Sequence, residues 1–208
     1  MTAMRPSVRT IVTVALAAAL AGLAGLAAGC SSSGSHQLSG LVRSPKLDVA
    51  SVQLPDVSTQ PASTFAMKAK PGGFLLVYFG YTMCPDLCPM TLATLRAARS
   101  DLGSAASRVE IAFVTLDPAR DTPAVLRSYV SRYMADAHLL RSASSTKLAA
   151  AKHSFLVSAS MAANGTITHS ASVAVVDSRG VVQVEWPFGL SAKTIARDLR
   201  TLLDRETA

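Results

Sequence analysis

The chain has 208 residues, enough for one domain with a hydrophobic core, and it carries a formal net charge of +7. The basic residues are scattered rather than clustered and no nucleic-acid recognition motif is present, so we expect no nucleic-acid partner. The chain contains 3 cysteines, too few for a fold that depends on a disulfide framework.

The N-terminus has the pattern of an export signal. Two arginines precede an apolar run over residues 11–28, and a glycine and Cys30 follow it. This pattern resembles a bacterial lipoprotein signal, so we expect residues 1–29 to be removed as a signal peptide and Cys30 to carry a lipid. The alternative is an uncleaved signal anchor, because the run approaches the lower length limit of a membrane span. Both interpretations place the remaining chain on the extracytoplasmic face of the cell membrane.

The remaining chain divides into a tether and one domain. Residues 30–46 are rich in serine and glycine, so we expect a flexible tether there. Residues 47–208 are expected to form the folded domain, which begins with an N-terminal hairpin within 47–73.

The domain alternates strand and helix signals. Two continuous apolar runs, Phe74–Phe79 and Ile111–Leu116, are typical of strands buried on both faces of a sheet. Leucines at helical spacing follow the first run, and a capping residue with an early proline at Asp121–Pro123 predicts a second helix. The expected helices lie at 89–102, from 123 onward, at 145–155 and after Ser191, and the expected strands at 74–79, 111–116, 137–140, 172–176 and 181–184.

This order predicts an α/β fold. Alternating strands and helices give a parallel centre, and a closing hairpin adds an antiparallel edge. We therefore expect a thioredoxin-like domain, in which a mixed central sheet is flanked by helices and ends in a C-terminal β-hairpin and helix.

Cys84 and Cys88 form a C-x3-C pair between a predicted buried strand and a predicted helix. Binding sites in α/β sheets lie at the carboxyl ends of strands, and a helix N-terminus favours thiolates. A C-x2-C pair would be typical of thioredoxin-type redox chemistry, whereas two thiolates at wider spacing suit a soft ion such as Cu(I). One imidazole would complete a site that also accepts Cu(II).

Structural zinc is the chemical competitor, but it requires four protein ligands. Two incidental buried cysteines are the remaining alternative.

The third ligand must come from the histidines. His169 lies in the loop just before the predicted C-terminal hairpin. In a thioredoxin-like fold that loop lies against the cysteine loop, so we expect His169 to be the ligand. His36 lies in the tether and receives no role. His138 is expected to fill a half-buried strand position, and His153 to pack or face solvent on its helix.

Three segments together resemble the Sco/SenC family of copper proteins. Tyr81–Pro89 is similar to that family's cysteine signature, and Thr115–Pro123 is similar to its second motif. His169 matches the third element in order and spacing. The resemblance covers about residues 70–204, although the segment 155–168 is unlike a typical member.

The resemblance implies copper as cofactor and Cys84, Cys88 and His169 as its ligands. It also implies delivery of copper to the dinuclear centre of cytochrome c oxidase subunit II, or reduction of that centre's cysteines. The implied acceptor is subunit II. Because thiols outside the cytoplasm tend to oxidise, we also expect a thiol reductant as a partner, and an upstream copper donor is a further candidate. Asp117 either hydrogen-bonds a ligand or orients the loop beside the site, or it caps the turn at Pro118, and both roles stay open.

Three functions are compatible with a cysteine pair and a histidine in this fold. Metal binding and transfer without catalytic turnover is the first, and thiol–disulfide exchange by Cys84 and Cys88 is the second. Thioredoxin-type oxidoreductases place a cis-proline before the late hairpin, but no proline occurs between Pro123 and Pro187, and His169 stands there instead. This favours metal binding. A peroxidase would need an arginine near the cysteines, and Arg120, which we expect to pair with a neighbouring acid on the surface, is the nearest candidate.

Overall fold

The computed structural model describes residues 37–207. The predicted signal peptide, Cys30 and His36 lie outside this range. Among the described residues, no helix is long and apolar enough to cross a membrane.

A seven-stranded mixed sheet forms the centre of the domain, in the order β2-β1-β5-β4-β3-β8-β9. The three central strands β5, β4 and β3 are parallel, and the strands on both sides pair antiparallel to them and to one another. The strands are β1 (Gln53–Asp56), β2 (Ser63–Ala66), β3 (Phe74–Gly80), β4 (Val109–Thr115), β5 (His138–Leu140), β8 (Ser172–Val176) and β9 (Val182–Pro187). The predicted α/β order, the N-terminal hairpin and the C-terminal hairpin are confirmed.

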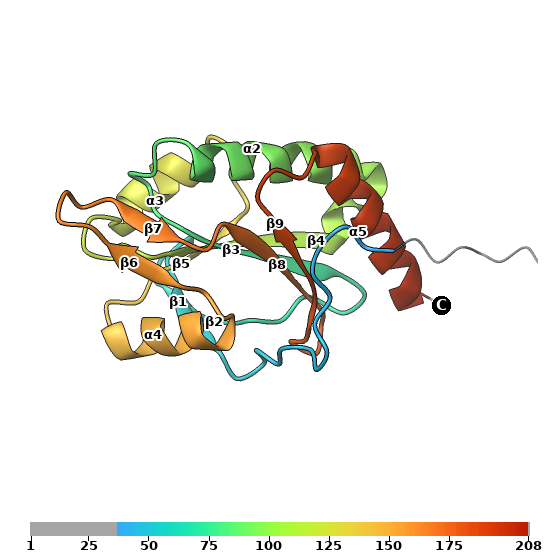
Figure 1. The fold of residues 1–208 in the computed structure, drawn as a ribbon, viewed down its shortest axis with the longest axis horizontal. Helices are drawn as coiled ribbons and strands as arrows, with labels where there is room; N and C mark the ends of the chain where they lie inside the picture. Colours follow the sequence, from blue (N-terminus) through green and yellow to red (C-terminus); the bar gives the residue numbers. More distant parts are fainter. Residues whose placement is uncertain (1–36, 208) are drawn as a thin grey trace, which may run out of the picture. The chain divides into compact units, whose positions relative to one another are not determined.

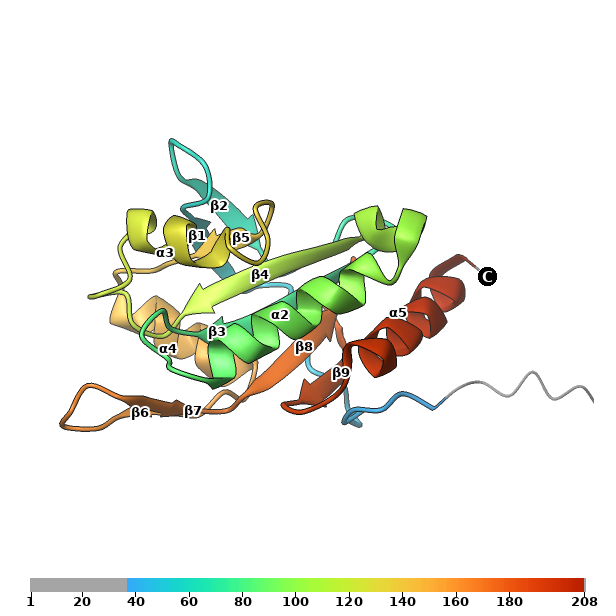
Figure 2. The same ribbon diagram turned by 90° about the horizontal axis from the view of Figure 1, so that it is seen from above.

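Helices cover both faces of this sheet. In Figures 1 and 2, α2, α3 and α5 lie over one face, and α4 lies on the other. Successive right-handed crossovers from β3 to β4 and from β4 to β5 place α2 and α3 on the same face. The helices are α2 (Leu87–Ser100), a 3-10 helix (Gly103–Arg108), α3 (Pro123–Val130), α4 (Ser145–Ser154) and α5 (Ala192–Thr207).

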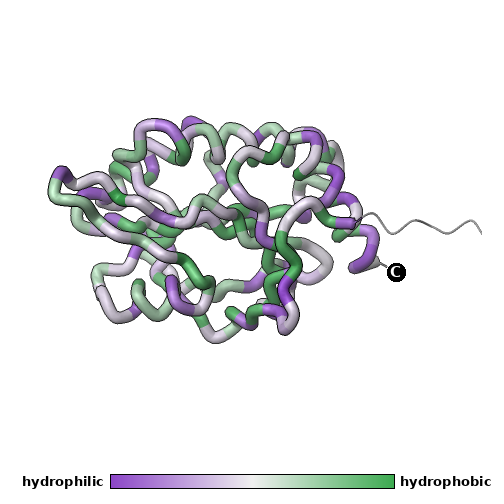
Figure 3. Tube along the Cα trace, viewed as in Figure 1, coloured by the Kyte–Doolittle hydropathy of each residue, from purple (hydrophilic) through white to green (hydrophobic). Residues whose placement is uncertain are grey.

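The core lies on both sides of the central strands. All seven residues of β3 are buried, as the continuous apolar run predicts. Figure 3 shows the hydrophobic colouring concentrated in the strands inside the layers of helices. The carboxyl ends of β3 and β4 are therefore fixed by packing, and the loops that follow them carry the cysteines and the second motif.

A small hairpin, β6 (Ala159–Met161) with β7 (Ile167–His169), stands apart from the main sheet. Figure 2 shows it extending beyond the end of β8. The sequence gives no strand signal here, because most side chains of both strands are exposed or half-buried and no apolar alternation results. His169 is thus the last residue of a strand rather than part of a loop.

The chain upstream of β1 pairs with the domain from Ser39 onward. The backbone of Leu41 exchanges hydrogen bonds with Glu185 of the edge strand β9, and the Ser39 amide donates to Asp198 on α5 at 2.7 Å. An edge strand exposes unpaired backbone groups, and this segment covers them. These contacts extend the folded part of the chain upstream of the predicted boundary at residue 47.

Candidate metal centre

The cysteines occupy the loop after β3 and the first turn of α2. Cys88 is fully buried, Cys84 is nearly so, and both thiols are free. The Cys88 amide points at the Cys84 sulfur, with the nitrogen 3.4 Å from Sγ. Amides at a helix start carry partial positive charge, so the Cys84 sulfur lies at the electropositive end of α2.

His169 at the end of β7 faces the thiols. Its Nε2 lies 3.9 Å from the Cys88 Sγ, and its Nδ1 lies 2.9 Å from the carbonyl oxygen of Ser170. A carbonyl oxygen can only accept a hydrogen bond, so Nδ1 carries the proton in the neutral ring. The Nε2 lone pair is therefore directed at the sulfurs, which is the tautomer that binds a metal.

The structure brings the three predicted ligands together. The sulfurs of Cys84 and Cys88 and a ring nitrogen of His169 all lie within 4.8 Å of one another. Metal–sulfur and metal–nitrogen bonds are about 2.0–2.3 Å long, so donors on one ion are separated by up to about twice that length. Two soft sulfurs and one imidazole in this space fit one copper ion.

Cys88 sits in an environment that keeps its thiol neutral in the metal-free protein. Burial raises the pKa of Cys88 to about 12, although a hydrogen bond from the Tyr78 hydroxyl, 3.4 Å from Sγ, opposes the increase. A metal ion that binds here must displace the proton, so binding is coupled to proton release.

Tyr78 and Gly80 are site residues that sequence reasoning missed. Both belong to the apolar run of β3, and nothing in that run distinguishes them from core residues. The Tyr78 hydroxyl contacts Cys88, and a Cβ on Gly80 would lie 2.9 Å from the Cys88 sulfur. Only glycine therefore lets the buried thiol approach the end of the strand.

The other two histidines that the structure describes lie elsewhere in the domain. The Nδ1 of His138 is 2.7 Å from Asp56 and its Nε2 is 3.4 Å from Glu110, so both ring nitrogens have partners. His153 is exposed on α4. Neither belongs to the cluster that contains Cys84 and Cys88.

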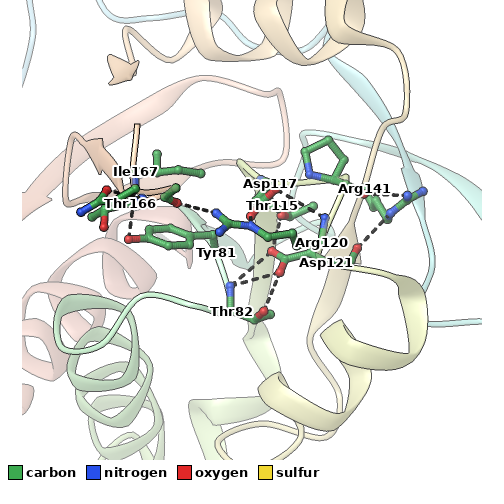
Figure 4. A network of polar contacts seen from close by, with 12 residues as sticks. Tyr81, Thr82, Thr115, Asp117, Arg120, Asp121, Arg141, Thr166 and Ile167 are labelled. Atoms are coloured by element: carbon green, nitrogen blue, oxygen red, sulfur yellow. Dashed lines mark hydrogen bonds and ion pairs between the residues drawn. The ribbon is translucent and has the colours of Figure 1, made fainter. Parts of the chain in front are cut away.

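The second motif lies in the loop between β4 and α3, shown in Figure 4. The buried Asp117 carboxylate accepts from the Arg120 amide and pairs with the Arg120 guanidinium, so its contacts are those of a turn cap. The expectation that Arg120 and Asp121 form a surface pair is wrong. Asp121 is fully buried and accepts from the hydroxyls of Thr82 and Thr115, each at 2.5 Å.

A cleft of about 270 Å³ opens between the cysteine loop and the β6–β7 hairpin. Cys84 and His169 line it, whereas Cys88 lies behind them in the core. The lining residues are Tyr81, Cys84, Pro85, Asp86, Leu87, Thr166, Ile167, Thr168 and His169. One water occupies about 30 Å³, so the cleft has room for a side chain from another molecule.

A thioredoxin-like domain in which two thiols and one imidazole converge defines a class of metal-binding rather than purely redox proteins. The family model described as SCO1/SenC matches residues 56–204, more than half of the chain. The chain belongs to the SCO1/SenC family.

Among relatives, "Protein SCO1, mitochondrial" of Saccharomyces cerevisiae is 41% identical over 70 residues, which cover 33% of this chain and 24% of that protein. The stretches aligned with the curated relatives span less than half of those relatives' length.

Solved structures match over more of the chain. Bradyrhizobium japonicum ScoI with copper bound has a TM-score of 0.63 and 27% identity, covering 72% of this chain and 95% of that one. A SCO1/SenC family lipoprotein from Bacillus anthracis has a TM-score of 0.66 and 19% identity, covering 78% and 96%. Because the Bacillus anthracis protein is only 19% identical, its similarity to this chain concerns the fold alone.

Proposed function

We propose that this protein binds copper through Cys84, Cys88 and His169 and delivers it to the dinuclear copper centre of cytochrome c oxidase subunit II. The observation that carries this proposal is the convergence of the two thiols with the unprotonated Nε2 of His169. Family membership supports both the metal and the acceptor, and a solved relative has copper bound.

The donor set suits a carrier that holds copper in both oxidation states. Two thiolates are sufficient for Cu(I), a soft ion that tolerates low coordination numbers. Cu(II) prefers nitrogen and oxygen donors, which here come from the imidazole. Copper would be the cargo of this protein, and an acceptor's ligand could reach it from the cleft that Cys84 and His169 line.

Transfer then proceeds by ligand exchange. Cys84 borders the cleft, so a thiolate of the acceptor replaces it first, while Cys88 and His169 still hold the ion. The acceptor's remaining ligands then replace those two, and the released thiols take up protons. The high pKa of Cys88 favours its protonation and thus release of copper from the donor.

The second candidate function is reduction of the acceptor's cysteines. It rests on the contrast between Cys84 at the cleft and Cys88 in the core. Cys84 would attack the acceptor's disulfide to give a mixed disulfide, and Cys88 would then close the Cys84–Cys88 bond and release a dithiol.

We further propose that a lipid on Cys30 holds the domain at the extracytoplasmic face of the cell membrane, near its acceptor. Replacement Cys30→Ser should then release the protein from the membrane fraction. A variant that stays membrane-bound and uncleaved would instead indicate a signal anchor.

A transfer assay separates the two functions. Copper-loaded protein is mixed with the copper-free, reduced soluble domain of subunit II, and the copper on each protein is measured after separation. A chaperone moves its copper to the acceptor, and Cys84→Ser and Cys88→Ser abolish loading. A reductase instead produces free thiols in a disulfide form of the acceptor, using the copper-free protein. No copper transfer together with efficient reduction would overturn the first proposal in favour of the second.

A further inference from the structure

The loop between β4 and α3 contacts both halves of the metal centre. On one side, the Asp121 carboxylate accepts from the Thr82 hydroxyl at 2.5 Å and from the Thr82 amide at 3.2 Å. Thr82 lies two residues before Cys84, so these bonds fix the start of the cysteine loop. Asp121 is fully buried and is itself held to β4 by the Thr115 hydroxyl.

On the other side, Arg120 contacts the hairpin that carries His169. Its guanidinium donates to the Gly165 carbonyl oxygen at 2.6 Å, at the turn between β6 and β7. The same guanidinium pairs with the buried Asp117. Figure 4 shows the Arg120 side chain extending from Asp117 toward Thr166 and Ile167, while Asp121 faces Thr82.

The turn of the hairpin is shaped to receive this arginine. Gly165 has a φ of +80°, and a Cβ at that position would lie 2.8 Å from an Arg120 nitrogen. A side chain there would therefore be strained and would displace the guanidinium. Glycine meets both the backbone and the steric requirement.

The hairpin has little other support near its turn. The residues of β6 are half-buried or exposed, and in β7 only Ile167 is buried. The Ile167 amide donates to the Tyr81 hydroxyl at 3.3 Å, and Ser158 and Ser170 bond to each other at the open end. A segment with so few buried contacts opens easily unless polar contacts hold it.

We propose that Arg120 is a positioning residue for His169, and that Arg120 and Asp121 together form a clamp that sets the separation between the imidazole and the two thiols. This inference rests on the proposed copper site. Adjacent residues of one rigid loop hold the histidine hairpin and the cysteine loop, so the third ligand stays in place before copper arrives. Cu(II), which needs the imidazole, depends on the clamp more than Cu(I) does.

The test is Arg120→Lys, with Arg141→Lys as the matched control. A lysine at 120 keeps a positive charge near Asp117 but lacks the planar fork that bonds both partners. Arg141 holds the same loop through the carbonyl oxygens of Pro118 and Asp121, and neither bond reaches the hairpin. Both variants thus replace an arginine that contacts the β4–α3 loop by lysine, and only Arg120→Lys removes the link to Gly165.

Two measurements on the full chain in detergent give the result. Amide hydrogen exchange of the metal-free, reduced protein should become about tenfold faster in peptides covering 162–169 for Arg120→Lys, the effect of one lost charge-assisted hydrogen bond. Cu(II) affinity should fall by about tenfold, and Cu(I) affinity by less than about threefold. Gly165→Ala, which keeps Arg120 but places a Cβ 2.8 Å from its guanidinium, should act in the same direction.

If Arg120→Lys has the same rate of amide hydrogen exchange in the hairpin and the same Cu(II) affinity as Arg141→Lys, the clamp is overturned. An equal loss of Cu(I) and Cu(II) affinity would also contradict it, because general loosening of the site would then be the cause. A wild-type chain that binds no copper would contradict the proposed function, whereas faster hairpin exchange in Arg120→Lys would still support the clamp.

Discussion

At the scale of single residues, the Tyr78 hydroxyl distinguishes one thiol of the centre from the other. It is buried in β3 and donates to the Cys88 sulfur at 3.4 Å. A hydrogen bond to a metal-bound thiolate withdraws electron density from the sulfur and tunes the metal. We therefore expect Tyr78 to tune the proposed copper site without being a ligand.

Tyr78→Phe should shift the sulfur-to-copper charge-transfer band of the Cu(II) protein to longer wavelength. The reason is that a thiolate without its hydrogen bond gives up an electron more easily. Copper affinity at neutral pH should fall by a few-fold, the effect of roughly one weak hydrogen bond. Absorption spectra and copper titrations measure both effects.

The matched control is Tyr129→Phe. The Tyr129 hydroxyl is buried and has no hydrogen-bond partner among the described residues, so its removal should leave the band unchanged. If the two variants give the same spectrum, Tyr78 has no role in tuning the site.

At the scale of the elements, a half-buried charge cluster ties the hairpin β1–β2 to the sheet. His138 on β5 bonds Asp56 on β1 and Glu110 on β4, and Phe65 on β2 packs against its ring. Burial opposes ionisation of Asp56, but hydrogen bonds from His138 and Ser58 lower its pKa to about 2. Burial likewise opposes a charge on His138, but its bonds to the two carboxylates raise its pKa.

These shifts define a pH window for the pair. The stabilisation from His138 is complete below its ordinary pKa of 6.5 and is lost as the pH rises through the raised value. The stabilisation from Asp56 is complete above its ordinary pKa of 3.8 and is lost as the pH falls toward about 2. The pair therefore stabilises the fold most between these two ordinary values.

His138→Gln should lower the free energy of unfolding by about 1–2 kcal/mol near pH 5, and by less above neutral pH. Urea unfolding of the wild type and the variant at both pH values measures the difference. His153→Gln, an exposed change on α4, should have no such dependence. A His138→Gln effect that is constant or grows as the pH rises would contradict the assigned charge state.

The elements also show what the sequence could predict. The strands β3 and β4 follow from continuous apolar runs, and the start of α3 follows from Thr122 and Pro123, with the Thr122 side chain capping as expected of a helix start. The hairpin β6–β7 could not be predicted, because its strands are mostly exposed and it is held by single contacts from Tyr81 and Arg120. Those contacts join residues far apart in the chain.

The same limit applies to the metal centre. The spacing and chemistry of Cys84, Cys88 and His169 predict the ligands, and the structure brings them together. The roles of Tyr78, Gly80 and Arg120 depend on distances across the fold, which residue types and spacing do not contain. The sequence therefore predicts the three metal ligands, whereas the residues that orient them are found only from the structure.

At the scale of the whole molecule, the proposed location imposes a redox requirement. Outside the cytoplasm thiols tend to oxidise, and a Cys84–Cys88 disulfide cannot bind copper. Both thiols are free in this structure. At the proposed location, loading is therefore expected to require a reductant, and the two proposed functions, copper delivery and disulfide reduction, would use the same two sulfurs.

The central claim is that copper is held by two thiols and the His169 imidazole, and Cu(II) spin resonance of His169→Ala tests it most directly. His153→Ala is the matched control, since that ring is exposed on α4 outside the cluster. The account predicts that His169→Ala loses the nitrogen signature and at least about tenfold in Cu(II) affinity, while Cu(I) binding changes much less and His153→Ala behaves as wild type. An unchanged nitrogen signature and Cu(II) affinity in His169→Ala would contradict it.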